Sequence, residues 1–231
     1  MTERTIVIKL SGSLFSSEKF SEVVRAIRER ITLDLGLLLI LVSGGGATAR
    51  KYIAAGFALG LDQATLDELG IEASRLNAVL LREALSQFAI DSIPRNLREL
   101  VFEKELNQDK RILVTGGFHP GQSTNAVAAI IAEKTRADLF INATDVDGVY
   151  DKDPGMFRDA KKLYSVTPRT LSEILESESV SPGGYDLMDP VALKLIERSK
   201  VHTRIVKCDP GVISMLLQGR ESVGTAIVFD S

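Results

Sequence analysis

Short apolar runs alternate along the chain with segments whose apolar residues recur at the period of an α-helix. The runs at residues 5–10, 37–42, 112–114 and 139–143 predict β-strands. Residues 37–42 are apolar without interruption, as is typical of a strand covered on both faces of its sheet. The segment between the first two runs carries an apolar stripe with helical spacing, made by Phe20, Val23, Val24, Ile27 and Ile31.

The same alternation continues through the rest of the chain. Further helices are predicted at residues 46–52, 63–88, 126–133, 191–199 and 212–218, and one begins at Pro168. Thr167 before Pro168 and Asp189 before Pro190 are pairs typical of a helix start. Further strands are predicted at residues 203–206 and 226–229. Strands that alternate with helices predict an α/β fold whose mostly parallel sheet is sandwiched by helices.

The long helix in the middle of the chain and the region from about residue 165 onward have further features. The helix predicted at residues 63–88 carries an apolar stripe of its own, formed by Leu76, Val79, Leu80 and Leu85. Polar residues interrupt this stripe, namely Asp67, Glu68, Arg75 and Asn77. We expect the region from about residue 165 onward to form a second lobe and the SPGG sequence at residues 181–184 to be mobile.

Composition narrows the possible functions. The chain has 231 residues and a formal net charge of −3, which gives no support for a nucleic acid or an anionic membrane as partner. The longest apolar run, residues 35–42, is too short to span a bilayer, and the start lacks the apolar core of a signal peptide, so we expect a cytoplasmic protein. Cys208 is the only cysteine, which excludes an intrachain disulfide and indicates a buried apolar role. The two histidines are too far apart in sequence to suggest a metal site.

The most informative run is TGGFHPGQST at residues 115–124, between a predicted strand and a predicted helix. Paired glycines there allow backbone N–H groups to approach an anion, and the start of the following helix adds a favourable dipole. Ser123 and Thr124 are suited to cap that helix or to donate to a phosphate. An ordinary strand–helix turn with a good cap explains the same residues equally well.

A second glycine turn, residues 44–46, precedes another predicted helix. Arg50 follows one helical turn later and is either a phosphate ligand or a solvated helix residue. The first strand ends with Lys9 beside Gly12 and Ser13, so the lysine is either an exposed strand residue or a charge that neutralises transferring oxygens. Two glycine turns on one sheet edge would place two phosphate-binding ends at one crevice.

The polar segment at residues 142–154 also follows a strand. Asp145, Asp147 and Asp153 do not have the spacing of an EF-hand loop, and Tyr150 among them could flank a base. Lys194 lies near the start of its helix, so its ammonium leans toward the helix N-terminus, although a surface lysine is also common there. The chain contains neither a Walker-type loop nor a dinucleotide fingerprint after its first strand.

Taken in order, these motifs resemble the amino acid kinase superfamily, and within it the archaeal uridylate (UMP) kinase family. The resemblance covers essentially the whole chain and rests on KLSGS at 9–13, SGGGATARKY at 43–52, LGIEASRLNA at 69–78, TGGFHPGQST at 115–124, TDVDGVYDKDP at 144–154 and MDPVALKLIERS at 188–199.

The resemblance implies a three-layer αβα sandwich in one amino acid kinase domain, residues 1–231. An acceptor-binding lobe at about residues 1–135 would precede an ATP-binding lobe at about residues 136–231. The implied reaction is the magnesium-dependent conversion of ATP and UMP into ADP and UDP, carried out by a homohexamer built as a trimer of dimers.

The resemblance also implies roles for individual residues. The UMP site would comprise Gly45, Asp67, Phe118, His119, Pro120, Gly121, Gln122, Ser123 and Thr124. The ATP site would comprise Gly12, Ser13, Gly46, Arg50, Thr144, Asp145, Tyr150 and Asp153. Lys9 and Lys194 would contact the transferring phosphates as catalytic residues, and no side chain is assigned as a metal ligand. Asp67 would hold the ribose hydroxyls.

The chain departs from the pattern of many relatives at Asp145, where they carry asparagine, and at Asn125, where some carry an aspartate. Related kinases that phosphorylate isopentenyl phosphate, carbamate or acylated amino acids give a second interpretation, and Asp67 discriminates against it because an isoprenoid needs no ribose-binding carboxylate. A third interpretation is a non-catalytic nucleotide-binding subunit. The presence of both Lys9 and Lys194 argues against it.

Overall fold

The computed structural model describes residues 4–178, 187–220 and 222–229. The segment at residues 181–184, predicted to be mobile, lies outside the described residues. Within those residues no helix is long and apolar enough to cross a membrane.

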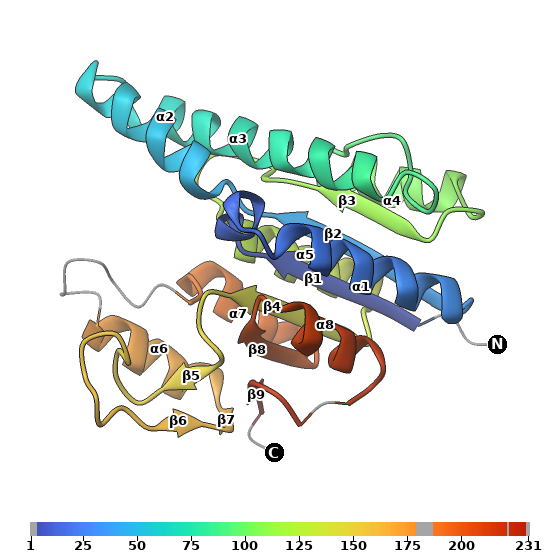
Figure 1. Cartoon of the computed structure of the whole chain (residues 1–231). Coiled ribbons are helices and arrows are strands. Elements are labelled where there is room, and N and C mark those ends of the chain that lie inside the picture. The colour runs from blue at the N-terminus through green and yellow to red at the C-terminus, as the bar shows by residue number, and fades with distance from the viewer. Residues whose placement is uncertain (1–3, 179–186, 221, 230–231) are drawn as a thin grey trace.

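A seven-stranded sheet forms the centre of the molecule, with strand order β3-β2-β1-β4-β8-β9-β7 (Figure 1). Its strands are β1 (Arg4–Leu10), β2 (Leu37–Ser43), β3 (Ile112–Thr115), β4 (Leu139–Thr144), β7 (Ser165–Val166), β8 (Thr203–Lys207) and β9 (Thr225–Ile227). All neighbouring strands are parallel except β8 and β9. The largely parallel sheet predicted from the alternating pattern is therefore confirmed. A separate antiparallel pair joins β5 (Val149–Tyr150) to β6 (Lys162–Leu163).

Helices cover both faces of the sheet. They are α1 (Phe20–Leu33), α2 (Gly46–Ala58), α3 (Gln63–Ala84), α4 (Leu97–Leu106), α5 (Thr124–Thr135), α6 (Pro168–Glu178), α7 (Pro190–Ser199) and α8 (Pro210–Leu217), with a 3-10 turn η1 at Gly12–Ser16. Side chains alternate along β1, so Ile6 and Ile8 pack with α1, α3 and α8, whereas Val7 packs with α5 and α7. In Figure 1, α1 and α8 lie in front of the strands and α5 lies behind them. This is the predicted three-layer arrangement.

Several predicted elements differ from the structure in ways that packing explains. The long helix ends at Ala84, four residues before the predicted end at residue 88, and α4 was not predicted because Leu100 is its only fully buried side chain. Of the apolar stripe predicted in the long helix, Leu85 is fully buried, whereas Leu76 and Leu80 are 62% and 48% exposed. The face of α3 that packs against the protein instead contains Leu66, Ile71, Ala73, Ala78 and Leu81, together with the polar residues Ser74 and Asn77.

The strand register places the ends of five strands at one edge of the sheet. Leu10 lies beside Ser43 and Ala143, Val42 beside Thr115, and Thr144 beside Lys207. The chain leaves β1 toward β2 on one side, while β4 pairs with β1 on the other. Ligands of open α/β sheets bind at such a switch point, outside the carboxyl ends of the strands. The loops that follow β1, β2, β3 and β4 therefore share one edge with this switch point.

Phe140 offers a test of the core because it is fully buried on β4, between α5 and the sheet. We expect Phe140→Ala to reduce the free energy of unfolding by about 3–5 kcal/mol, since it removes a large apolar group and leaves a cavity. Guanidinium denaturation followed by circular dichroism measures this. Phe102→Ala, at a side chain that is 60% exposed, is the control and should change stability little. Equal losses in the two variants would contradict the packing.

Candidate active site

The loops after β1 and β2 meet backbone against backbone. A Cβ atom on Gly12 would lie 2.1 Å from the Gly46 nitrogen, and one on Gly44 would lie 2.7 Å from the Gly12 nitrogen. Gly46 also has a φ of 60°, which glycine adopts without strain. Only glycine fits at these three positions. The result is a junction of bare backbone at the start of α2, where N–H groups are accessible to an anion.

Helix α3 holds this junction and the glycines that follow β3. The Asn77 amide nitrogen donates to the Gly44 carbonyl at 2.7 Å, and the Gly117 N–H donates to the Ser74 hydroxyl at 2.7 Å. The Ser43 hydroxyl donates to the Ser74 carbonyl at 2.8 Å. Ser74 and Asn77 were not among the predicted site residues. Asn77 did interrupt the apolar pattern of the helix, and that interruption was the available signal.

The residues predicted to bind the acceptor are brought together. One Asp67 carboxylate oxygen accepts a 2.7 Å hydrogen bond from the Gly121 N–H, so α3 holds the loop between β3 and α5. The Arg75 guanidinium donates to the Phe118 carbonyl at 3.2 Å. The Phe118 side chain is only 5% exposed and belongs to the core, so it anchors one end of this loop. The loop residues that are exposed are His119, Pro120, Gly121 and Gln122.

Ser123 caps helix α5 and also connects it to α7. Its hydroxyl oxygen accepts a 3.0 Å hydrogen bond from the Ala126 N–H, while its proton goes to the Asp189 carboxylate. Asp189 in turn caps α7, because its other oxygen accepts from the Val191 and Ala192 N–H groups at 3.0 Å. The Ser123 hydroxyl is therefore engaged, and the backbone amides of the first turn, together with the side chain of Thr124, are what this end of α5 can offer an anion.

A polar cluster occupies the switch point between β1 and β4. The Ser11 hydroxyl donates to Asp145 Oδ1 at 2.9 Å, and the Ser13 hydroxyl donates to the same oxygen. Thr144 shapes the turn that presents Asp145, since its hydroxyl donates to the Val146 carbonyl at 3.0 Å. Ser11 was missing from the predicted site, and nothing in its sequence context distinguishes it from an ordinary turn residue.

Lys9 is half-buried on β1, in register with Val42 of β2 and Asn142 of β4. Burial raises the pKa of the nearby Cys208 thiol to about 11, although the charge of Lys9 acts in the opposite direction. The thiol is therefore protonated at neutral pH, in keeping with the buried apolar role predicted for Cys208. Lys9 and Asp145 lie at neighbouring strand ends, since Ser11, two residues after Lys9, donates to Asp145.

The remaining predicted residues are more peripheral. Tyr150 lies in β5, where its hydroxyl donates to Asp147 at 2.8 Å, and this bond raises the pKa of Tyr150. Asp153 accepts from the Gly155 N–H at 2.7 Å and so stabilises its own turn. Arg50 and Lys194 are exposed on α2 and α7. Across residues 4–178, 187–220 and 222–229, no hydrogen bond or ion pair joins either cation to another predicted site residue.

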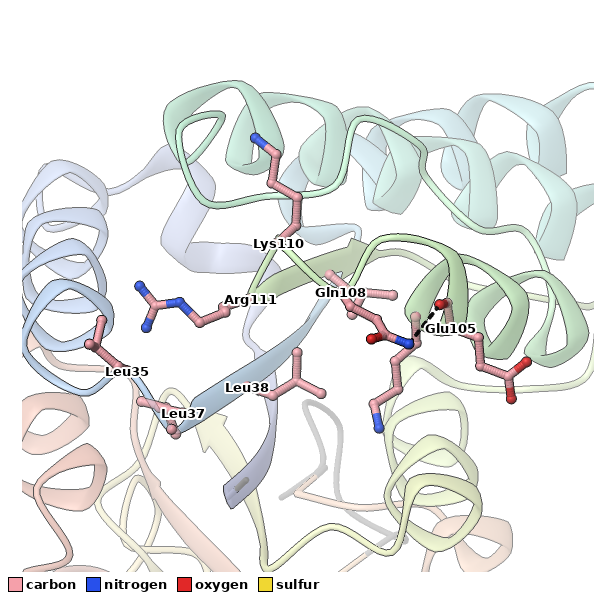
Figure 2. Close-up of a pocket in the computed structure, with 10 residues that line it drawn as sticks. Leu35, Leu37, Leu38, Glu105, Gln108, Lys110 and Arg111 are labelled. Carbon is pink, nitrogen blue, oxygen red and sulfur yellow. Dashed lines mark hydrogen bonds between the residues drawn. The ribbon is translucent and has the colours of Figure 1, made fainter. Parts of the chain in front are cut away.

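A cavity of about 530 Å³ lies at the opposite edge of the sheet, by the amino ends of β2 and β3. It is lined by Leu35, Gly36, Leu37, Leu38, Lys104, Glu105, Gln108, Lys110, Arg111 and Leu113. Figure 2 shows the side chains of Lys110 and Arg111 pointing away from each other. Arg111 donates to the Asp34 carbonyl at 2.7 Å, which holds the loop before β2. This cavity contains none of the predicted site residues.

Residues 4–207 match the amino acid kinase family. The chain belongs to this family. It is 48% identical over 199 residues to the uridylate kinase of Sulfurisphaera tokodaii, covering 85% of this chain and 86% of that protein. It is 41% identical to the uridylate kinase of Sulfolobus acidocaldarius, with 96% and 98% coverage. The structure of uridylate kinase from Archaeoglobus fulgidus superimposes with a TM-score of 0.83 at 39% identity, over 96% of this chain and 99% of that one.

The likeness extends to more distant structures. The UMP kinase of Bacillus anthracis has a TM-score of 0.77 at 20% identity, which shows the shared fold alone. The family assignment agrees with the geometry. Two sets of loops suited to anions face one sheet edge, and Lys9 lies at the strand end between them. Such an arrangement is suited to moving a phosphoryl group between two anionic substrates, because that chemistry depends chiefly on positioning and on stabilising charge.

Proposed function

We propose that this chain transfers the γ-phosphoryl group of ATP to UMP, giving ADP and UDP, as a step of pyrimidine nucleotide synthesis. The observation that carries the proposal is the meeting of two loops at one sheet edge. The acceptor loop is held by the contact between Asp67 and Gly121, and the glycine junction is formed by Gly12 and Gly46. The uridylate kinases that match nearly the full chain support it.

The chemistry needs no covalent intermediate. The phosphate of UMP is already a nucleophile near neutral pH, so the enzyme has to align it with the γ-phosphorus and stabilise charge on the equatorial oxygens. We propose that the Lys9 and Lys194 ammonium groups neutralise this charge, together with backbone amides of the glycine junction. The Asp189 contact supports a role for Lys194, because it fixes the start of α7 against the start of α5.

Individual binding roles are proposed on the same basis. UMP would lie along Gly45, Asp67 and the loop of Phe118, His119, Pro120, Gly121, Gln122, Ser123 and Thr124. ATP would lie along Gly12, Ser13, Gly46, Arg50, Thr144, Asp145, Tyr150 and Asp153. We also propose that the first of the two lobes, about residues 1–135, carries the acceptor and the second the ATP, although a single sheet runs through both. The proposed location is the cytoplasm.

Magnesium is the proposed cofactor, and the residues present fit it. The described ranges contain no group of three or more histidine, cysteine, aspartate or glutamate side chains that could hold a metal by themselves. Magnesium does not need such a group, since it is commonly bound by one or two carboxylates, substrate phosphates and water. Bound with ATP, it would neutralise part of the phosphate charge. The proposed ATP site has two carboxylates, Asp145 and Asp153. Asp153 accepts from the Gly155 N–H in its own turn, whereas Asp145 lies at the switch point and is the candidate to contribute an oxygen to the metal.

A substrate panel tests the proposed reaction. We expect ADP release, measured with coupling enzymes, with UMP as acceptor and much slower release with isopentenyl phosphate or carbamate. Lys9→Ala should lower kcat by at least about tenfold with a smaller change in the KM for UMP, because its charge acts mainly in the transition state. Lys134→Ala, at an exposed lysine near the end of α5, is the control. If none of the acceptors supported ADP release, the result would favour a non-catalytic nucleotide-binding protein.

Asp67 tests the assignment of the ribose. We expect Asp67→Asn to weaken UMP binding by about 1.5–3 kcal/mol, as the loss of a charge-assisted hydrogen bond would. Calorimetry with UMP and with dUMP tests whether Asp67 contacts the ribose 2′-hydroxyl. If Asp67 contacts the 2′-hydroxyl, the loss is smaller for dUMP. Equal losses would exclude a contact between Asp67 and the 2′-hydroxyl. Glu68→Gln, at the next residue along α3, should leave both affinities unchanged.

We also propose that the chain assembles as a homohexamer, a trimer of dimers. The exposed apolar side chains of Leu76, Val79 and Leu80 on α3 support self-association, because a stripe of this kind is covered in many oligomers. We expect the double substitution of Leu76 and Leu80 by glutamate to reduce the mass measured by light scattering. Leu33→Glu, at an exposed leucine that ends α1, should not. An unchanged mass in the double variant would exclude α3 from the interface.

A further inference from the structure

The carboxylate of Asp145 is held by one oxygen only. Both the Ser11 and the Ser13 hydroxyl groups donate to Oδ1, and the two hydroxyl oxygens lie 2.9 Å apart. Within the part of the chain that the structure describes, no hydrogen bond or ion pair reaches Oδ2. Asp145 is exposed, whereas Ser11, which supports its Oδ1, is only 8% exposed.

This carboxylate lies at an unfavourable place for an isolated negative charge. It follows β4 at the switch point, next to Gly12 and the glycine junction where the phosphates of a nucleotide are proposed to bind. Two anions a few ångströms apart repel each other, and Lys9 carries a single positive charge against the several negative charges of ATP or ADP. A divalent cation between the carboxylate and the phosphates would convert this repulsion into attraction.

We propose that Asp145 Oδ2 is a direct ligand of the divalent cation that accompanies the nucleotide, and that Ser11 and Ser13 position the carboxylate through Oδ1. The inference rests on the proposed function, since the remaining ligands are phosphate oxygens and water. An oxygen donor of this kind suits magnesium, which takes few protein carboxylates when it is bound to a nucleotide. P-loop enzymes reach a comparable solution with a hydroxyl residue and an aspartate, although this chain has no such loop.

The test uses Mn²⁺ as a spectroscopic probe. The full-length protein is titrated with Mn²⁺ in the presence of saturating ADP, and free Mn²⁺ is measured by electron paramagnetic resonance. Asp145→Asn keeps an oxygen that accepts from both serines but removes the charge. We expect this variant to bind Mn²⁺ at least about tenfold more weakly in the ADP complex, a typical consequence of losing a metal ligand or its support. Its affinity for ADP in EDTA should be equal or higher, because the repulsion is gone.

Controls separate the metal ligand from a structural role. Asp147→Asn changes a nearby carboxylate that pairs with Lys162 and should leave Mn²⁺ binding unchanged. Ser13→Ala should weaken Mn²⁺ binding less than Asp145→Asn, since Ser11 still supports the carboxylate. Equal Mn²⁺ affinities of wild type and Asp145→Asn would overturn the proposal, as would equal losses of ADP affinity with and without metal.

The outcomes also distinguish this inference from the proposed function. A wild-type protein that binds Mn²⁺ with ADP and phosphorylates UMP, but whose metal affinity does not depend on Asp145, would refute only the ligand assignment. A wild-type protein that binds no Mn²⁺ with ADP would refute the ligand assignment, and the absence of any UMP turnover would refute the proposed function. UMP affinity, measured without metal, should be the same in wild type and Asp145→Asn.

Discussion

The ends of β1 and β2 are held together by contact between main-chain atoms at Gly12, Gly44 and Gly46. Any side chain at these positions would overlap the backbone of the other loop, and Gly46 in addition needs a positive φ. The contact fixes the separation of the two loops without using a polar side chain. Both loops can therefore present N–H groups to the same space. The other groups of the candidate site are arranged around this junction.

Helix α3 connects the glycine junction to the loop that is proposed to bind the acceptor. Its side chains reach three loops, through Asn77 to Gly44, through Ser74 to Gly117 and through Asp67 to Gly121. Ser74 and Asn77 lie on the packed face of the helix, where polar groups are costly unless they are paired, and both are paired with loop backbone. Leu76, Val79 and Leu80 lie outside this packed face and are exposed, whereas Leu66, Ile71 and Leu81 of the same helix are buried. One helix therefore sets the distance between the proposed donor and acceptor sites and also presents an apolar surface.

The sequence predicts the elements that have a local pattern, but not the contacts that α3 and α7 make with distant loops. The strands and the glycine turns follow from local patterns, because the apolar run and the glycine pair are each determined by their immediate neighbours. The roles of Ser74 and Asp189 depend on partners 43 and 66 residues away, Gly117 and Ser123 respectively. No local period reveals such a pair. The exposure of Leu76 and Leu80 could not be predicted for the same reason, since an apolar helical stripe looks identical whether or not it faces the core.

The link between Ser123 and Asp189 bears on how the two proposed sites act together. Asp189 places a negative charge at the start of α7 and, through Ser123, at the start of α5, so it satisfies both helix dipoles before any phosphate arrives. A bound acceptor phosphate would compete with that carboxylate for positive charge. In the proposed role of Lys194, one turn into α7, its charge would offset this competition, because side chains on a helix lean toward the helix N-terminus. The lysine would then balance the Asp189 carboxylate, which holds the starts of the two helices together.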